Sequence, residues 1–246
     1  MKNQYRPAQP GCHDRASERQ TANHDWCGGV YCKEATMTPS LRSLSRIIGM
    51  LIVASVAPLA AGQAARDAAD VAKLIEILEI RAGASVADVG AGGGALVPPM
   101  SRHVGSAGRV YATDLNADRI ADLRKLVASE SLKNVTVVEG GAAQTNLPDA
   151  CCDVIFMRLV YHHFGDPAAM NASLLRSLKP GGRLAVLDFM PASKVTAAPG
   201  KRGEGDAHGV MPATVIEELK AAGFVDVREI PWPEPTVAVV GKRSEK

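Results

Sequence analysis

Hydrophobic positions along the chain change spacing at regular intervals from residue 65 onwards. Stretches in which apolar residues recur every three or four positions predict amphipathic helices, and short apolar runs between them predict strands. Regular alternation of the two predicts an α/β fold with parallel strands and helices on both faces. Helices are predicted over 66–79 and 95–103 and from Asn116, Asp166 and Pro212; strands are predicted over 86–89, 109–114, 135–139, 154–158, 183–189, 225–229 and 237–240.

The last two predicted strands differ from the others because only the proline-rich linker 231–235 joins them. This linker is too short for a crossover helix, so the two strands should pair antiparallel. We therefore expect a Rossmann-like sheet of seven strands, mostly parallel, with an antiparallel C-terminal strand. Pro98 and Pro99 should kink or shorten the second helix, and residues 192–210 should form a long loop.

The N-terminal quarter of the chain lacks this periodicity. Residues 1–36 are polar and predict a disordered extension. Residues 37–64 begin with two arginines, continue with the apolar run 47–61 and end in small residues, a pattern typical of a cleaved signal peptide. Export to the periplasm is the resulting expectation, and the alternative is an N-terminal helix packed on a cytoplasmic domain. The folded domain should then span residues 65–246.

The composition of the chain excludes several classes of function. The formal net charge is +2 and aromatic residues make up 4% of the chain, so we expect no basic field or stacking platform for nucleic acid. A small-molecule substrate is the remaining expectation. The five cysteines contain no CxxC pair, and neighbouring cysteines rarely bridge. We therefore expect no disulfide between Cys151 and Cys152 and no metal site.

A glycine-rich segment from Asp88 to Gly94 follows the first predicted strand. Glycine lets the backbone approach a ligand closely, and ligands of such folds bind at the carboxyl ends of the strands. Gly90, Gly92 and Ala95 also fit the dinucleotide-binding pattern, which leaves a nicotinamide-dependent oxidoreductase as an alternative. Asp88 disfavours that alternative, because a carboxylate beside the loop suits a cationic amino-acid ligand and repels a pyrophosphate.

Further motifs support the prediction that the ligand contains a nucleoside. Asp114 ends the second strand, where a carboxylate can accept hydrogen bonds from both ribose hydroxyls. In order and spacing, several segments within 66–241 resemble the motifs of class I methyltransferases that depend on S-adenosylmethionine (SAM). These segments are 88–94, Asp114, Leu147-Pro148 before Cys152-Asp153-Val154-Ile155, and 178–184. Residues 161–164, Tyr-His-His-Phe, further resemble a bacterial subgroup that often carries an export signal.

The resemblance implies SAM as the cofactor and methyl transfer as the activity. It implies that Asp88 and the glycines of the loop hold the amino-acid part of SAM, that Asp114 binds the ribose, and that Leu115 packs on the adenine. Many relatives carry an acid after the third strand, but this chain does not. Ala142 and Gln144 are therefore expected to contact the adenine instead.

Candidates for the acceptor side follow the fourth strand. Arg158 is expected to bind the cofactor or an anionic substrate, with a structural ion pair as the alternative. His162 and His163 are candidate general bases, because histidine titrates near neutral pH; since they are adjacent, at most one should face the substrate. Tyr161 lies in the same stretch, and His208 lies in the loop expected to cover the site. Methyl transfer mainly needs alignment of the acceptor with the methyl group. SAM binding without catalysis is a further alternative, because SAM is made in the cytosol and an exported enzyme would lack its donor.

Overall fold

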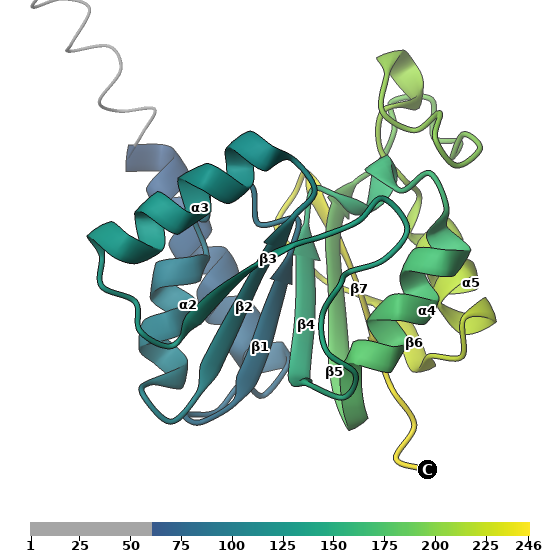
Figure 1. Cartoon of the computed structure of the whole chain (residues 1–246). Helices are drawn as coiled ribbons and strands as arrows, with labels where there is room; N and C mark the ends of the chain where they lie inside the picture. The colour runs from purple at the N-terminus through teal and green to yellow at the C-terminus, as the bar shows by residue number, and fades with distance from the viewer. Residues whose placement is uncertain (1–60) are drawn as a thin grey trace, which may run out of the picture. The chain divides into compact units, whose positions relative to one another are not determined.

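A seven-stranded sheet forms the centre of the domain (Figure 1). The computed structural model describes residues 61–246 and has the strand order β3-β2-β1-β4-β5-β7-β6. Strands β1 to β5 are parallel, and β7 is antiparallel to both β5 and β6, so the predicted Rossmann-like sheet is confirmed. The strands are β1 (Ser85–Val89), β2 (Arg109–Asp114), β3 (Val135–Glu139), β4 (Cys152–Arg158), β5 (Leu178–Phe189), β6 (Val225–Ile230) and β7 (Thr236–Lys242).

Helices cover both faces of this sheet (Figure 1). The helix over 61–77, α2 (Val97–Val104) and α3 (Ala117–Ser129) lie on one face, and α4 (Pro167–Ser177) and α5 (Pro212–Ala221) lie on the other. Successive strand residues point to opposite faces, so Val86 belongs to the core under the first group of helices and Ala87 to the core under the second. The helical and strand periods of the sequence had predicted these elements.

Helix starts follow local chemistry. Asn116 caps α3 by accepting hydrogen bonds from the backbone N–H groups of residues 118 and 119, and Asp166 caps α4, whose first residue is Pro167. Both starts were predicted. Pro98 and Pro99 do not kink α2, because they occupy its first turn, where the N–H groups have no intrahelical partner in any case. The helix instead begins two residues later than predicted.

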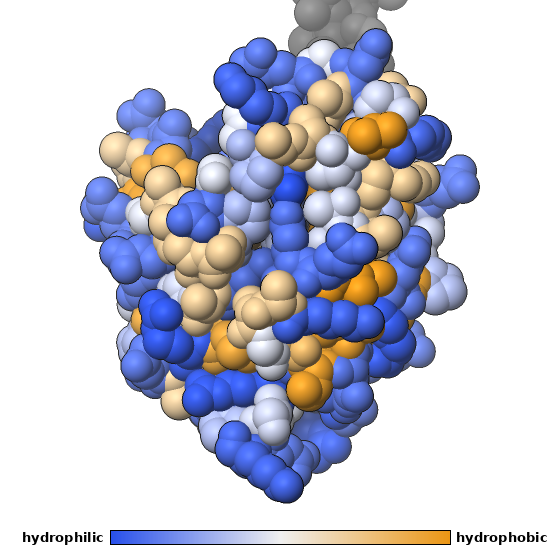
Figure 2. All heavy atoms as spheres, turned by 90° about the vertical axis from the view of Figure 1, so that its right-hand side faces the viewer, coloured by the Kyte–Doolittle hydropathy of each residue, from blue (hydrophilic) through white to orange (hydrophobic). Residues whose placement is uncertain are grey.

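Helices α4 and α5 bury the apolar side that their spacing predicted. Met170, Leu174, Val215 and Leu219 are all less than 5% exposed. Seen from this side, the surface of the molecule shows hydrophilic residues around separate groups of hydrophobic ones (Figure 2). The apolar side chains of these two helices therefore stabilise the sheet, while their outer faces carry alanines together with charged residues such as Arg176, Glu217 and Lys220.

The N-terminal predictions fall mostly outside the described residues. Residues 1–36 and all but the last four residues of the signal-like segment 37–64 belong to that part of the chain. Residues 61–64 lie in the helix over 61–77, so the domain boundary expected after residue 64 falls within a helix. Within residues 61–246, every helix is too short or too polar to cross a membrane.

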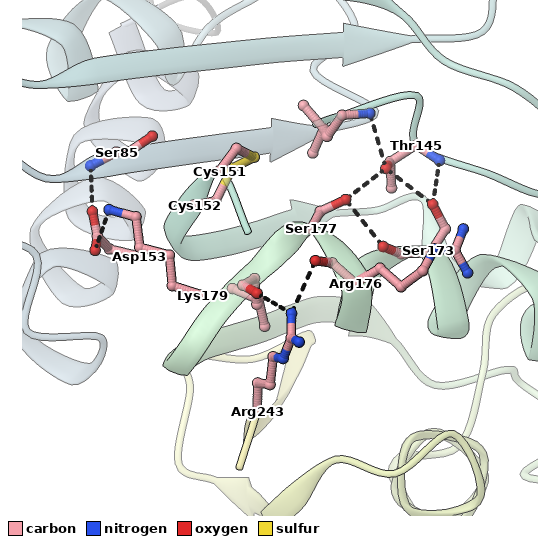
Figure 3. The surroundings of a disulfide bond; sticks show 12 residues. Ser85, Thr145, Cys151, Cys152, Asp153, Ser173, Arg176, Ser177, Lys179 and Arg243 are labelled. Atoms are coloured by element: carbon pink, nitrogen blue, oxygen red, sulfur yellow. Dashed lines mark hydrogen bonds and ion pairs between the residues drawn. A yellow bond between two sulfur atoms is a disulfide. The ribbon is translucent and has the colours of Figure 1, made fainter. Parts of the chain in front are cut away.

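Cys151 and Cys152 form a disulfide, so the expectation that these neighbours do not bridge was wrong (Figure 3). The chain turns sharply just before them, with a left-handed φ of 47° at Ala150, and such a turn lets adjacent side chains meet. Asp153 next accepts a hydrogen bond from the Ser85 backbone N–H at 2.8 Å. The disulfide thus lies at the amino end of β4, at the opposite edge of the sheet from the carboxyl ends.

Candidate functional site

The glycine loop between β1 and α2 contains two kinds of glycine. Gly90 and Gly94 have left-handed φ angles of 75° and 78°, and an added Cβ would lie 2.6 Å from a methyl of Val160 or of Leu126. These two glycines are required by the packing of the loop itself. Gly92 also has a left-handed φ, but an added Cβ there would meet no atom within 4 Å. The loop is therefore fixed by packing at Gly90 and Gly94 and open at Gly92, where a ligand has room to approach the backbone.

Asp88 lies under this loop, at 3% exposure. Burial raises the pKa of its carboxyl to about 7; the Arg158 charge lowers the pKa and Asp114 raises it slightly. A buried carboxyl is costly unless a cation or donor reaches it. Asp88 therefore fits the ammonium group of an amino-acid ligand.

Asp114 holds the loop from the end of β2. One carboxylate oxygen accepts the Gly92 N–H at 3.0 Å, and the other accepts the Asn116 N–H at 2.9 Å. Each carboxylate oxygen offers a second lone pair, so two acceptor positions stay free for hydroxyl groups. Asp114 is thus both a support of the loop and a suitable ribose ligand.

The predicted adenine contacts border Asp114. Leu115 is an apolar side chain at 64% exposure, directly after the strand. The stretch after β3 returns to the same edge, where the Gly140 N–H donates to the Asp114 carbonyl at 2.8 Å. Ala142 and Gln144 are both exposed in this stretch. The structure therefore brings the residues that were predicted to contact the nucleoside to one edge of the sheet.

Arg158 forms the structural ion pair that was the alternative to cofactor binding. Its guanidinium donates to Asp67 at 2.6 Å and to Asp70 at 2.9 Å, both from the helix over 61–77. Asp70 also accepts the indole N–H of Trp232 at 3.0 Å. Arg158 therefore joins the N-terminal helix to the carboxyl end of β4, and two carboxylates already balance its charge. No local pattern in the sequence indicates these partners, which are about 90 residues away.

Three histidines meet beyond the end of β4. His162 and His163 belong to the short 3₁₀ turn η1 (Tyr161–His163), and their ring centroids are 3.9 Å apart. The Nε2 atom of His208 lies 3.1 Å from that of His162. His162 is buried, whereas His163 and His208 are exposed. The tight turn brings the rings of both adjacent histidines close to that of His208. That at most one of the two faces the substrate stays a prediction.

Asp188 in β5 orients this cluster, and sequence reasoning missed it. Its carboxylate is 1% exposed and accepts His162 Nδ1 at 2.8 Å, the His162 backbone N–H at 3.1 Å and the Phe189 backbone N–H at 2.9 Å. An ionised carboxylate only accepts, so Nδ1 of His162 carries a proton. The Nε2 atoms of His162 and His208 then share one hydrogen bond at 3.1 Å. The signal in the sequence was an acid within the apolar run of β5.

His163 has a different environment from His162. Burial is the main cause that lowers the pKa of His163, and the neighbouring His162 and His208 lower it further. His163 is therefore a neutral imidazole at pH 7, with a free ring nitrogen. Gly203 of the covering loop lies against it, since an added Cβ there would be 3.4 Å from His163 Nδ1.

A buried network anchors the loop that carries His208. Arg202, at 2% exposure, pairs with Glu218 of α5, and the Tyr161 hydroxyl donates to the same carboxylate at 2.8 Å. Burial raises the pKa of Tyr161, and its ring is fully buried. Tyr161 therefore supports the site from within the core and, contrary to its predicted position, does not line it. The Arg202 carbonyl accepts the Gly209 N–H at 2.9 Å, one residue beyond His208.

Replacing Arg202 with methionine should lower the free energy of unfolding by about 3 kcal/mol, because it leaves the Glu218 carboxylate without its buried partner. Urea unfolding of the purified protein measures this loss. Lys179→Met is the matched control, since Lys179 and Asp153 form an ion pair whose side chains are both 42% exposed. The control should cost less than about 1 kcal/mol. Equal losses in both variants would contradict an anchoring role for Arg202.

A cavity of about 760 Å³ opens where β5 and β6 end and β7 begins, and neither the histidines nor the glycine loop are among its lining residues. Phe189 lines it, and the Phe189 ring centroid lies 5.0 Å from that of His162 and 4.8 Å from that of His208. Trp232, which is bonded to Asp70, lines it on another side. The cavity combines two aromatic rings with charged groups at its rim, among them Lys194 and two glutamates.

Comparison with known proteins agrees with this geometry. Residues 87–186 match the family model described as a methyltransferase domain. A curated relative, the ubiquinone/menaquinone biosynthesis C-methyltransferase UbiE of Marinomonas sp. (strain MWYL1), is 37% identical over 111 residues, which are 45% of this chain and 44% of the relative. The chain thus spans less than half the length of the curated relatives it matches.

Solved structures extend the likeness to the whole sheet. A SAM-dependent methyltransferase from Aquifex aeolicus has a TM-score of 0.60 and 28% identity, covering 70% of this chain and 89% of that one. Phosphoethanolamine N-methyltransferase 2 from Haemonchus contortus, solved in complex with SAM, has a TM-score of 0.59 and 14% identity, covering 71% of this chain and 52% of that one. The second likeness concerns the fold alone.

Proposed function

We propose that this domain, which belongs to the superfamily of class I SAM-dependent methyltransferases, transfers a methyl group from SAM to a hydroxyl of a small aromatic acceptor. The observation that carries the proposal is the arrangement of two sites at one sheet edge. A buried acid and an open glycine loop lie at the ends of β1 and β2, and a carboxylate-oriented histidine pair lies at the ends of β4 and β5.

The donor side binds by charge and hydrogen bonds. The carboxylate of Asp88 holds the ammonium of the amino-acid part, the glycine loop around Gly92 admits the ligand, and Asp114 accepts the ribose hydroxyls. When bound there, SAM supplies an electrophilic methyl on a cationic sulfur. The protein's main contribution to the rate is then alignment of the acceptor with that methyl.

The acceptor side suits an aromatic ring with an acidic hydroxyl. Phe189 and Trp232 offer apolar surface in the cavity, and aromatic rings pack well against one another. The UbiE relative is named a ubiquinone/menaquinone biosynthesis C-methyltransferase, so its name supports a quinone-like acceptor but not the hydroxyl as the methylated atom. These features support a phenol or hydroquinone over an aliphatic acceptor.

The histidines take the proton that the acceptor loses. The acceptor oxygen forms a bond to the methyl carbon while the carbon–sulfur bond breaks and sulfur keeps the electron pair. The hydroxyl proton passes to exposed His208, whose Nε2 shares its hydrogen with His162 Nε2 at 3.1 Å. Asp188 stabilises the positive charge that results, as an oriented carboxylate does behind a catalytic imidazole.

Titration calorimetry with the purified protein tests the donor. SAM and S-adenosylhomocysteine should bind, and NAD should not; binding of NADH without binding of SAM would overturn the proposal in favour of an oxidoreductase. A panel of phenols, hydroquinones, amines, thiols and carboxylates with radiolabelled SAM then tests the acceptor. Binding of SAM with no transfer to any of them would favour a SAM-binding domain without catalysis.

Changing Asp114 to asparagine should weaken SAM binding by about 10- to 150-fold, the effect of losing about 1.5–3 kcal/mol of hydrogen bonding to a charged group. Asparagine keeps one oxygen for the loop but presents donors where the second ribose hydroxyl must donate. Asp118→Asn, at an exposed position of α3, is the control and should bind SAM like the parent. An unchanged dissociation constant in Asp114→Asn would limit Asp114 to support of the loop.

A further inference from the structure

We infer that His162, His163 and His208 form a binding site for a divalent transition-metal ion such as zinc or cobalt(II). One ring nitrogen from each of the three residues lies within 4.8 Å of the others. Neutral imidazole nitrogens are preferred ligands of zinc, cobalt, nickel and copper. This proposal does not rest on methyl transfer, and it differs from the expectation from the sequence, which was that the chain has no metal site.

The distance between the nitrogens of His162 and His208 fits one shared ion. Two nitrogens bound to a tetrahedral zinc at about 2.0–2.1 Å lie about 3.3 Å apart, and the Nε2 atoms of His162 and His208 are 3.1 Å apart. His163 needs only a side-chain rotation to complete the set, since it is exposed and its ring already stacks on that of His162.

The surroundings of His162 are those of a metal ligand. Its Nδ1 donates to the buried carboxylate of Asp188 at 2.8 Å, which directs the lone pair of Nε2 towards His208. A carboxylate that orients a ligating histidine in this way is a regular feature of zinc sites and fixes the tautomer of the ligand.

The exposure of the cluster agrees with this assignment. His163 and His208 are both exposed, which gives an ion access from solvent. Three protein ligands also leave the fourth tetrahedral position open on that side, as in zinc sites that bind a further small molecule.

Cobalt(II) absorption spectroscopy on the untagged full chain, stripped of metal with a chelator, tests the site. The parent should show the visible absorption of tetrahedral cobalt with a stoichiometry of one, and zinc should abolish it. His163→Gln and His208→Gln should each weaken binding by 10-fold or more, and Asp188→Asn by about 10- to 100-fold through loss of ligand orientation. His103→Gln is the matched control, because His103 bonds to the Ile80 carbonyl outside the cluster.

Cobalt absorption that persists at the parent's affinity in both His163→Gln and His208→Gln would overturn the metal site. Variants that still bind SAM by calorimetry are folded, so loss of cobalt in them reports on ligation. Bound zinc occupies the nitrogens that the proposed proton transfer uses, and zinc should therefore slow methyl transfer in the parent but not in His163→Gln. Full transfer by the zinc-bound parent would leave the metal site standing and overturn the role of the histidines as bases.

Discussion

Asp88→Asn should weaken SAM binding by about 30-fold or more, the consequence of removing one member of a buried charge pair worth about 2–5 kcal/mol. Asparagine has nearly the shape of aspartate, so the loop should keep its conformation while the ammonium of the ligand loses its counter-charge. Calorimetry with SAM at pH 8 measures the effect. Asp149→Asn, on an exposed loop, serves as the control and should leave the affinity unchanged.

The same residue should make SAM binding depend on pH. The carboxyl of Asp88 has a pKa of about 7 in the free domain, and the ligand requires the ionised form. The affinity of the parent should therefore rise by up to about tenfold per pH unit between pH 5 and 7 and then level off. In Asp88→Asn this rise should be absent. An equal rise in both proteins would place the titrating group elsewhere.

The free energy of unfolding should fall as the pH rises, whereas the affinity for SAM should increase. The folded pKa of Asp88 is raised above the ordinary value of 3.8, so the folded state holds this proton more tightly than the unfolded state does. The free energy of unfolding should then fall between about pH 4 and pH 7, by at most about 1.4 kcal/mol per pH unit from this group. Asp88→Asn should lose this decline, so it gains stability relative to the parent as the pH rises. Urea unfolding at pH 5 and pH 8 tests the sign.

His162→Gln should slow methyl transfer by about 100-fold or more at saturating SAM, the low end of the range for acid–base assistance. The affinity for SAM should barely change, because Asp88, the glycine loop and Asp114 are untouched. In the metal-free parent the rate should also rise with pH through one ionisation, and the variant should lose that dependence. Single-turnover measurements with the best acceptor of the panel give both quantities.

Two further variants separate catalysis from packing. His208→Gln should slow transfer to a similar extent, since it removes the exposed member of the pair, whereas metal-free His163→Gln should stay close to the parent. Unchanged rates and pH profiles in both His162→Gln and His208→Gln would mean that the histidines are structural and that alignment alone drives transfer. Loss of SAM binding in His162→Gln would instead indicate a disturbed fold.

The sequence by itself determined the elements and the position of the residues proposed to bind the donor. Strand and helix periods, caps such as Asn116 and Asp166 and the short linker before β7 are local features, and their consequences are decided by neighbouring residues. The position of the residues proposed to bind SAM was predictable for a related reason. Asp88, the glycine loop and Asp114 lie at the ends of adjacent parallel strands, so the fold class alone brings them to one edge.

The acceptor side was decided by tertiary structure. Asp188 meets His162 across 26 residues and His208 meets it across 46, and no period or spacing in the sequence encodes such pairs. Arg158 finds its carboxylates on a helix about 90 residues earlier, and Tyr161 turns into the core towards Glu218. Local sequence specifies which side chains can titrate or ligate; only the packing of distant segments specifies which of them touch, because burial and partner distance set their charge and their role.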